Sequence, residues 1–210
     1  MTIVVWDGKT LVTDRRVNGD SDEMASEATK IVTFEDKPWQ GDERLLSVSF
    51  TGRVQNLRFI LDYIKRHSRD YELQGFLDDF FETQIHLPNF GMLFITDKRA
   101  ITYENKVGGS QHRKNNWGTL NHSTSGPRKY IVMGSGEQYA LRMISVMDRE
   151  IDAKELLFLA TMGNDRLGGG FDEWSLEKRI IERGRCLTKK QKESLVKRFE
   201  RKILSHTIND

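Results

Sequence analysis

The chain has 210 residues and an almost balanced charge, with 33 Lys and Arg against 31 Asp and Glu. This length is sufficient for one domain with a sizeable core, and nothing in the composition requires two. Hydrophobic residues make up 37% of the chain. No apolar run approaches the roughly 20 residues of a membrane-spanning helix, so we expect no membrane partner.

The cysteine content and the first residues of the chain indicate the cellular compartment in which the protein is expected. The single cysteine, Cys186, has no partner for an internal disulfide and fits a reducing compartment. The start of the chain lacks the basic and apolar composition of a leader peptide. We therefore expect a cytoplasmic protein.

The first thirty residues predict a strand hairpin and a further strand. Residues 3–5 are a β-branched run, the Asp-Gly pair at 7–8 is a two-residue hairpin signal, and residues 11–12 resume the strand pattern. After a polar stretch the apolar pattern returns. Asp14 and Lys30 therefore fall on successive predicted strands.

Thr2 becomes the first residue when the initiator methionine is removed, and its small side chain permits that removal. One residue then carries both a hydroxyl nucleophile and a free α-amine that can deprotonate it. The amine suits this role because its reference pKa of roughly 7.7–8.0 lies close to neutral pH. Thr2 is therefore a candidate catalytic nucleophile.

The middle of the chain combines strands, helices and a long loop. Residues 45–52 form an apolar strand that runs into a turn of small residues. Two helices are expected over 53–84, followed by two strands near 90–105. The first helix is amphipathic, with these apolar residues on one face: Leu57, Ile60, Leu61 and Ile64.

A polar loop is expected over 105–129, rich in Gly, Asn, Ser, Lys and Arg. It contains His112, Trp117 and His122, and such basic and aromatic mixing also occurs in proteins that bind nucleic acid. A solvated insertion is favoured, because loops of this length often act as functional lids. The two histidines have neither cysteine partners nor zinc-ligand spacing. We therefore expect no metal, no cofactor and no nucleic-acid partner.

A strand near 129–134, a glycine turn and two helices over 137–163 come next. The turn reads Gly-Ser-Gly, with Ser135 at its centre. The helix after it places three apolar residues on one face: Ala140, Ile144 and Met147. Asp165 and three glycines at 168–170 then precede a short strand.

Three separated features resemble the N-terminal nucleophile hydrolases of the proteasome β-type and HslV-like peptidase family. The interval from Asp14 to Lys30 is 30 − 14 = 16 residues, the interval this family keeps between its active-site aspartate and lysine. The strand, turn and helix around Ser135 resemble the family element that places a serine beside the threonine nucleophile. The segment 165–174 resembles the family's Asp-x-x-Ser-Gly-Gly turn. The resemblance covers roughly residues 2–175.

The element order suggests two sheets packed between two helical layers. The resemblance implies the corresponding fold class: α+β, a four-layer αββα sandwich of the N-terminal nucleophile hydrolase type. It also assigns six site residues: Thr2, Asp14, Lys30, Ser135, Asp165 and Ser49.

The resemblance implies a role for each of these residues. The Oγ of Thr2 would attack a carbonyl while the α-amine takes the proton. Lys30 would lower the pKa of that amine by charge repulsion, and Asp14 would hold Lys30 in place. Ser135 and Asp165 would support the hydrogen-bond network around the N-terminus.

Two positions depart from the family pattern. The backbone N–H of Ser49 would stabilise the oxyanion, but Ser49 stands where the family usually has a glycine, so a side chain crowds the approach to the scissile carbonyl. Gly168 stands where the family commonly has a serine that helps to orient the free amine. Neither change removes the nucleophile, its base or Lys30.

The resemblance implies a threonine peptidase that hydrolyses unfolded polypeptide or peptide substrates inside a homo-oligomeric compartment, a ring or stacked ring. It leaves open whether an ATPase partner is required. Two alternatives use the same residues differently. In the first alternative, the chain is an N-terminal nucleophile amidase that cleaves a small amide. In the second, it is an inactive proteasome-like subunit with a role in assembly or interaction.

The charge is segregated between residues 1–177, the expected hydrolase domain, and 178–210, an expected basic helical extension. The extension has 11 Lys or Arg against 4 Asp or Glu, a net charge of 11 − 4 = +7. Thr188 and Gln191 form a capping box before an amphipathic helix. Its apolar face consists of Leu195, Val196, Phe199 and Ile203. The sequence leaves three roles open for this helix. It could pack on its own subunit, dock on a neighbouring subunit or acidic partner, or bind nucleic acid or an anionic membrane.

Overall fold

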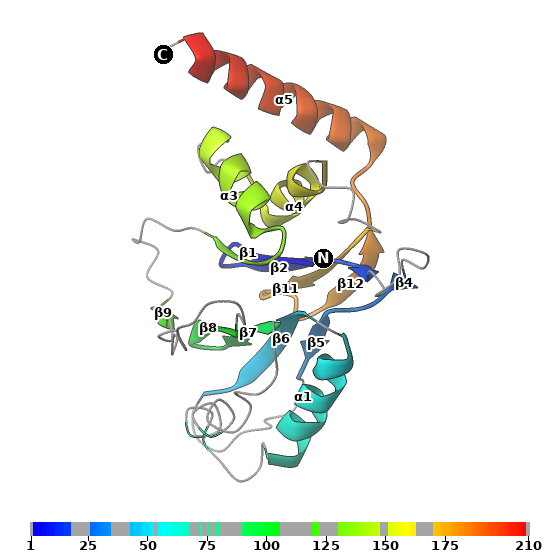
Figure 1. Cartoon of the computed structure of the whole chain (residues 1–210), viewed down its shortest axis with the longest axis vertical. Helices are drawn as coiled ribbons and strands as arrows, with labels where there is room; N and C mark the ends of the chain where they lie inside the picture. The colour runs from blue at the N-terminus through cyan, green and yellow to red at the C-terminus, as the bar shows by residue number, and fades with distance from the viewer. Residues whose placement is uncertain are drawn as a thin grey trace. The chain divides into compact units, whose positions relative to one another are not determined.

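The computed structural model describes residues 2–17, 26–34, 43–52, 54–67, 72, 75, 79, 90–105, 119–121, 130–147, 151–162 and 170–208. The chain divides into two compact units (Figure 1). Unit 1 comprises Met1–Lys30 and Gly126–Asp210, and unit 2 comprises Ile31–Ser125. Each unit has its own sheet and its own hydrophobic core.

A five-stranded antiparallel sheet forms the centre of unit 1. In spatial order its strands are β10 (Ile131–Gly134), β1 (Ile3–Trp6), β2 (Thr10–Asp14), β11 (Phe171–Ser175) and β12 (Ile181–Arg185). Because β1 pairs with both β10 and β2, the first strand of the chain is interior to the sheet. A short hairpin of β3 (Arg16–Val17) and β4 (Ser26–Glu27) follows β2.

Helices cover one face of this sheet. Among the described residues of unit 1 they are α3 (Glu137–Val146), α4 (Ala153–Met162) and α5 (Lys189–Ile208). The core between sheet and helices includes Ile3, Val12 and Leu156, each fully buried. Burial of one such side chain stabilises the fold by about 1.5–3 kcal/mol. Figure 1 shows α5 beyond α3 and α4 as seen from the sheet.

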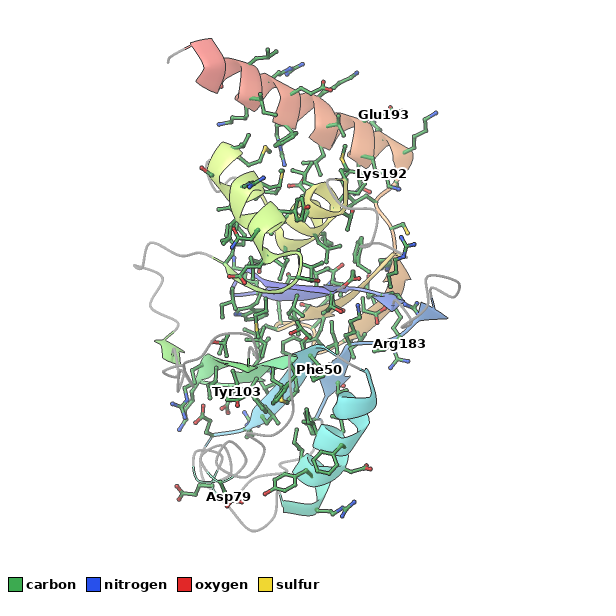
Figure 2. The ribbon with its side chains drawn as sticks, viewed as in Figure 1. Phe50, Asp79, Tyr103, Arg183, Lys192 and Glu193 are labelled. Carbon is green, nitrogen blue, oxygen red and sulfur yellow. The ribbon has the colours of Figure 1, made fainter. Side chains whose placement is uncertain are left out.

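The basic helix α5 packs on its own unit. It begins at the predicted capping box, in which the Thr188 N–H donates to Gln191 Oε1 at 2.9 Å and the Gln191 N–H donates to Thr188 Oγ1 at 3.3 Å. Leu195 is buried in the core. Lys192, labelled in Figure 2, lies 5.5 Å from the centroid of the Phe158 ring on α4. The helix is present where it was predicted, and Leu195 and Phe199 of its predicted apolar face pack on the core, whereas Ile203 of that face is 41% exposed.

Unit 2 has a second five-stranded antiparallel sheet and its own helix. The strands, in spatial order, are β5 (Ile31–Thr33), β6 (Leu45–Thr51), β7 (Phe90–Thr96), β8 (Arg99–Asn105) and β9 (Thr119–Asn121), and the helix is α1 (Val54–His67). Ile60 and Ile64 of α1 are fully buried with Phe50 and Phe90 of the sheet. Phe50 is labelled in Figure 2. The amphipathic helix predicted after residue 53 is therefore confirmed.

Four strands and one turn differ from the sequence expectations. Strands β3 and β4 lie in the stretch expected to be polar. Strand β9 falls in the predicted polar loop, where three residues extend the sheet by pairing with β8. Strand β12 falls in the predicted helical extension. Its side chains are largely exposed and charged, as is common at a sheet edge, so the strand has no apolar alternation. The first hairpin turns at Gly8 and Lys9, because the Asp7 N–H donates to the Thr10 carbonyl.

The remaining expectations concern the fold class, the second helix, the polar loop, the domain boundary and a membrane-spanning helix. The protein is α+β with two antiparallel sheets, as predicted. Of the second helix expected within 53–84, only residues 72, 75 and 79 are described, and His112, Trp117 and His122 lie outside the described residues. The expected boundary after residue 177 falls within the β11–β12 hairpin. In the part of the chain that the structure describes, no helix is long and apolar enough to cross a membrane.

Candidate active site

The β1–β2 hairpin places Asp14 beside the start of β1. Val4 pairs with Thr13 in this hairpin, so the next residues outward, Ile3 and Asp14, are neighbours. The Ile3 N–H donates to Asp14 Oδ1 at 2.8 Å, and Asp14 is fully buried. The carboxylate is therefore held against the backbone that carries Thr2.

Lys30 reaches the same carboxylate from another segment. The β3–β4 hairpin returns the chain toward the end of β2, and Lys30 follows it immediately before β5, outside the strand itself. Its Nζ donates to Asp14 Oδ1 at 2.9 Å and to the Arg16 carbonyl at 2.8 Å. The Lys30 residue is only 3% exposed. The predicted contact between Asp14 and Lys30 is thus present.

Burial controls the electrostatics of this pair. It raises the pKa of Asp14 above its usual value, against the opposing attraction of Lys30 and the Ile3 hydrogen bond. It also lowers the pKa of Lys30, against the opposing attraction of Asp14 and then of Asp172. Both shifts have the same origin, because removal from water disfavours a charged group. The charged pair is therefore held at a cost in solvation free energy.

The Gly-Ser-Gly turn binds the backbone of Thr2. Ile3 pairs with Gly134 at the end of β10, and Gly134 has a φ of 94°, a left-handed conformation that favours glycine. The chain then turns so that Ser135 Oγ accepts from the Thr2 N–H at 3.0 Å and donates to the Thr2 carbonyl at 3.3 Å. The Gly136 N–H also donates to that carbonyl at 3.3 Å.

Four of the six predicted site residues are therefore connected within unit 1. Ser135 contacts Thr2, and Asp14 links the adjacent Ile3 to Lys30. Thr2 itself is 8% exposed. When Thr2 is the first residue, the nitrogen that bonds Ser135 is a free amine instead of an amide. Hydroxyl, amine, buried cation and carboxylate then provide the groups of a self-activating nucleophile.

The other two predicted residues are not part of this cluster as described. Ser49 lies in unit 2, fully buried on β6 between its pairing partners Ile31 and Leu93. Asp165 lies outside the described residues, as does Gly168. Among the described side chains, no three His, Cys, Asp or Glu residues gather in a way that could hold a metal ion.

Comparisons with known proteins address the fold. No protein-family model matches the chain, and no curated protein matches it. Among solved structures, Anbu (ancestral beta-subunit) from Yersinia bercovieri aligns with a TM-score of 0.56 at 14% identity, over 95% of this chain and 92% of that chain. An Anbu mutant from Hyphomicrobium sp. strain MC1 aligns with a TM-score of 0.62 at 12% identity, over 100% and 95%.

Eukaryotic HslV from Trypanosoma brucei aligns with a TM-score of 0.52 at 14% identity, over 82% of this chain and 97% of that chain. Anbu and HslV are both proteasome-β-like N-terminal nucleophile hydrolases. The chain has the proteasome β-type fold. At this level of identity the likeness is one of fold, and the resemblance predicted from sequence is confirmed at that level.

Within this proteasome β-type fold lies a second buried carboxylate that the sequence pattern does not single out. Asp172 on β11 pairs with Thr13 on β2 and is fully buried. Its Oδ1 accepts from the Gly184 N–H at 3.0 Å and lies 3.6 Å from Arg15 Nε. An aspartate one residue into a strand after a glycine run is the available sequence signal. The contact with Gly184 depends on a strand that the sequence pattern does not reveal.

Proposed function

We propose that the chain is a threonine-type peptidase of the HslV and proteasome β type, with Thr2 as nucleophile after removal of Met1. The observation that carries this proposal is the connected set of contacts around Thr2. Ser135 lies at the Thr2 nitrogen, and the buried Asp14–Lys30 pair is bound to the next residue, Ile3. A hydrolase with a proteasome-like fold agrees with the structural neighbours.

In this mechanism the α-amine of Thr2 removes the proton from its own Oγ as Oγ attacks the carbonyl carbon of the substrate. The tetrahedral intermediate then collapses as its C–N bond breaks, and the protonated α-amine gives its proton to the departing amine of the substrate. Water hydrolyses the remaining acyl-enzyme ester: the neutral α-amine accepts a proton from the water and returns it to Thr2 Oγ as the product acid leaves. The Lys30 ammonium keeps the amine in its neutral, proton-accepting form by charge repulsion. Asp14 fixes the position of Lys30, and Ser135 orients the amine through its hydroxyl.

The remaining predicted residues have supporting roles in the proposal. The N–H of Ser49 binds the oxyanion, and Asp165 supports the N-terminus. Both roles are those that the family resemblance implies for these positions. The serine side chain at 49 narrows the approach to the carbonyl, so we expect a preference for small substrate side chains beside the scissile bond.

Hydrolysis by Thr2 is tested with an unstructured fluorogenic peptide and three proteins: wild type, Thr2→Ala and Thr2→Ser. Thr2→Ala should abolish hydrolysis and leave the fold intact, because it removes one hydroxyl from the residue before a formed strand. Thr2→Ser should keep partial activity. Equal cleavage by wild type and Thr2→Ala would refute the assignment.

The same assay separates the alternatives. A wild-type protein that hydrolyses small amides and leaves peptides intact is the amidase. A protein that lacks Met1 and cleaves neither substrate is the inactive assembly subunit, a reading that the absent serine at Gly168 favours.

We further propose that the peptidase works in the cytoplasm inside a symmetric homo-oligomer, because an exposed nucleophile would cut any unfolded chain. The interfaces would come from α1, α3 and α4, with α5 strengthening them. An ATPase partner is compatible with this arrangement and is not required by it. Light scattering on the full chain should give a mass of several subunits, and a monomer at micromolar concentration would contradict the compartment.

A further inference from the structure

A buried carboxylate outside the predicted site, Asp172, lies on β11 next to the strand that carries Asp14. Asp172 has no exposed surface, and its Oδ2 has no hydrogen-bond partner in the part of the chain that the structure describes. Its Oδ1 accepts from the Gly184 N–H at 3.0 Å and lies 3.6 Å from Arg15 Nε. A buried carboxylate with one oxygen unsatisfied is costly. Its presence therefore calls for a compensating charge nearby.

A bulge in β12 supplies the hydrogen bond to Asp172. The pairing of β11 with β12 shifts between Phe171 and Glu173, whose partners are Arg185 and Glu182. The partner strand thus has one extra residue, and the bulge includes Gly184 with a φ of 63°. Arg183, the exposed residue before it, is labelled in Figure 2. The bulge turns a backbone N–H toward the carboxylate and away from the ladder.

Gly184 also provides room for Arg15. A Cβ atom at position 184 would lie 2.8 Å from Arg15 Nη1, which is closer than real Cβ contacts. The Arg15 side chain therefore lies directly against the glycine of the bulge. The guanidinium, the carboxylate of Asp172 and the backbone of β12 form one cluster at the end of β2.

This cluster reaches Lys30 by two routes. Arg15 is bonded through its backbone to Gly170 and Ala28, and its neighbour Arg16 provides the carbonyl to which Lys30 donates. Asp172 also pairs with Thr13, the residue before the Asp14 that accepts from Lys30, and its negative charge opposes the effect of burial on the Lys30 pKa. Lys30 is thus influenced by two carboxylates, Asp14 on β2 and Asp172 on β11, and Arg15 is the cation beside the second.

We propose that Asp172 is a positioning residue for Lys30. Its carboxylate, fixed by the β12 bulge and by Arg15, is the second negative charge that retains the Lys30 ammonium in a buried site and steadies the Arg16 carbonyl. The coupling of Asp172 to Lys30 stands on its own. Its effect on turnover rests on the proposed function, in which the Lys30 charge activates the Thr2 amine. The segment 181–185, beyond the resembled region, thereby contributes to the active site.

The coupling is tested without any substrate, by NMR titration of the Lys30 Cε signal in full-length protein with 13C-labelled lysine. The signal is assigned by its loss in Lys30→Arg. Asp172→Asn should lower the titration midpoint by about one pH unit, because one attracting charge is removed. Glu173→Gln is the matched control. It removes the adjacent carboxylate of β11, which pairs with Lys154 at 3.2 Å, and should leave the midpoint unchanged.

Arg15→Met is the second variant, on a side chain that is 22% exposed. It should raise the midpoint, because Asp172 loses its competing cation. A purely structural role would move both variants in the same direction or move neither. An unchanged midpoint in Asp172→Asn overturns the proposal. If Asp172→Asn fails to fold, an unchanged or lowered midpoint in Arg15→Met overturns it instead.

Turnover gives the second readout. In peptide hydrolysis, the alkaline limb of kcat/KM should shift to lower pH in Asp172→Asn, in step with the NMR midpoint, and should keep its position in Glu173→Gln. Undiminished hydrolysis by Thr2→Ala refutes the proposed function and leaves the titration result standing. A shifted NMR midpoint with an unshifted kinetic limb refutes the role of Asp172 in turnover.

Discussion

Two ion pairs, one in each unit, have the same contact distance and differ in burial. In unit 1, Lys30 Nζ lies 2.9 Å from Asp14 Oδ1, and the two side chains are 4% and 0% exposed. In unit 2, Arg44 Nε lies 2.9 Å from Asp97 Oδ2, and the side chains are 53% and 18% exposed. Burial raises the pKa of Asp14 despite its cation. At Asp97 the effect of burial is outweighed by hydrogen bonds from Arg44, so its pKa is lowered.

The difference indicates what each pair contributes. Asp97 follows β7 and joins the turn to Arg44 through the backbone as well. The Arg44 N–H donates to Asp97 Oδ1 at 2.9 Å, and the Asp97 N–H donates to the Arg44 carbonyl at 3.0 Å. This pair stabilises a turn. A buried ion pair often contributes no more to folding than an apolar pair of similar volume, and the presence of the Asp14 pair therefore agrees with the chemical role proposed for it.

The largest expected effect comes from breaking the buried pair on one side. Asp14→Ala should lower the free energy of unfolding by about 3–5 kcal/mol, because it leaves Lys30 buried without its carboxylate and the Ile3 N–H without an acceptor. Asp97→Ala, the matched change in unit 2, should cost about 1 kcal/mol. Urea unfolding of both variants measures the difference. Equal losses would show that burial does not distinguish the pairs.

Replacing both members of the buried pair should separate stability from activity. In Asp14→Asn combined with Lys30→Met, the asparagine oxygen can still accept from the Ile3 N–H, and no charge is buried. We expect this protein to lie within about 2 kcal/mol of wild type in unfolding free energy and to have lost peptide hydrolysis. Retained hydrolysis would mean that Lys30 is a structural residue only. The single variant Lys30→Arg keeps the positive charge but should still have low turnover, because a planar guanidinium differs from a compact ammonium.

Acidification should change the contributions of the two carboxylates to stability in opposite directions. The raised pKa of Asp14 means that the folded state takes up its proton first. As pH falls through that pKa toward about 3.9, wild type should gain stability relative to Asp14→Asn. The lowered pKa of Asp97 means that its contribution, present above the unfolded value, is lost as pH falls through the folded value. The advantage of wild type over Asp97→Asn should then shrink.

Unfolding free energies of the three proteins, measured from pH 7 downward, test these signs. Parallel changes in the two stability differences would contradict the assigned pKa directions.

The smallest loss of stability is expected for a change in the exposed ion pair of unit 2. Arg44→Gln should lower the free energy of unfolding by about 0.5 kcal/mol, because its guanidinium is largely solvated and the backbone bonds of the turn remain. The loss should decrease further in 1 M salt. A loss as large as that of Asp14→Ala would show that the surface pair is a main support of unit 2.

The sequence supports part of this account directly. The spacing of Asp14 and Lys30 and the Gly-Ser-Gly turn at Ser135 predict contacts that the structure contains, because both match a family pattern. Periodicity alone would not have indicated the contact of Ser135 with Thr2, which joins two distant segments of the sequence. Asp172 could not be recognised in the same way. Its hydrogen bond depends on a bulge around Gly184, and the charged edge strand that contains Gly184 has no apolar alternation. Contacts that depend on strand register are not visible in a single sequence.

Thr2 is the N-terminal nucleophile of the proposed mechanism, and every other role in the site depends on it. The most direct test is peptide mapping by tandem mass spectrometry, after the protein made in its native host has been incubated with a peptide β-lactone, which acylates an activated hydroxyl. We expect an N-terminal peptide that begins at Thr2 and carries the acyl group on Thr2 Oγ, and no acylation in Lys30→Met. An N-terminal peptide that begins at Met1, with Thr2 unmodified, would contradict it.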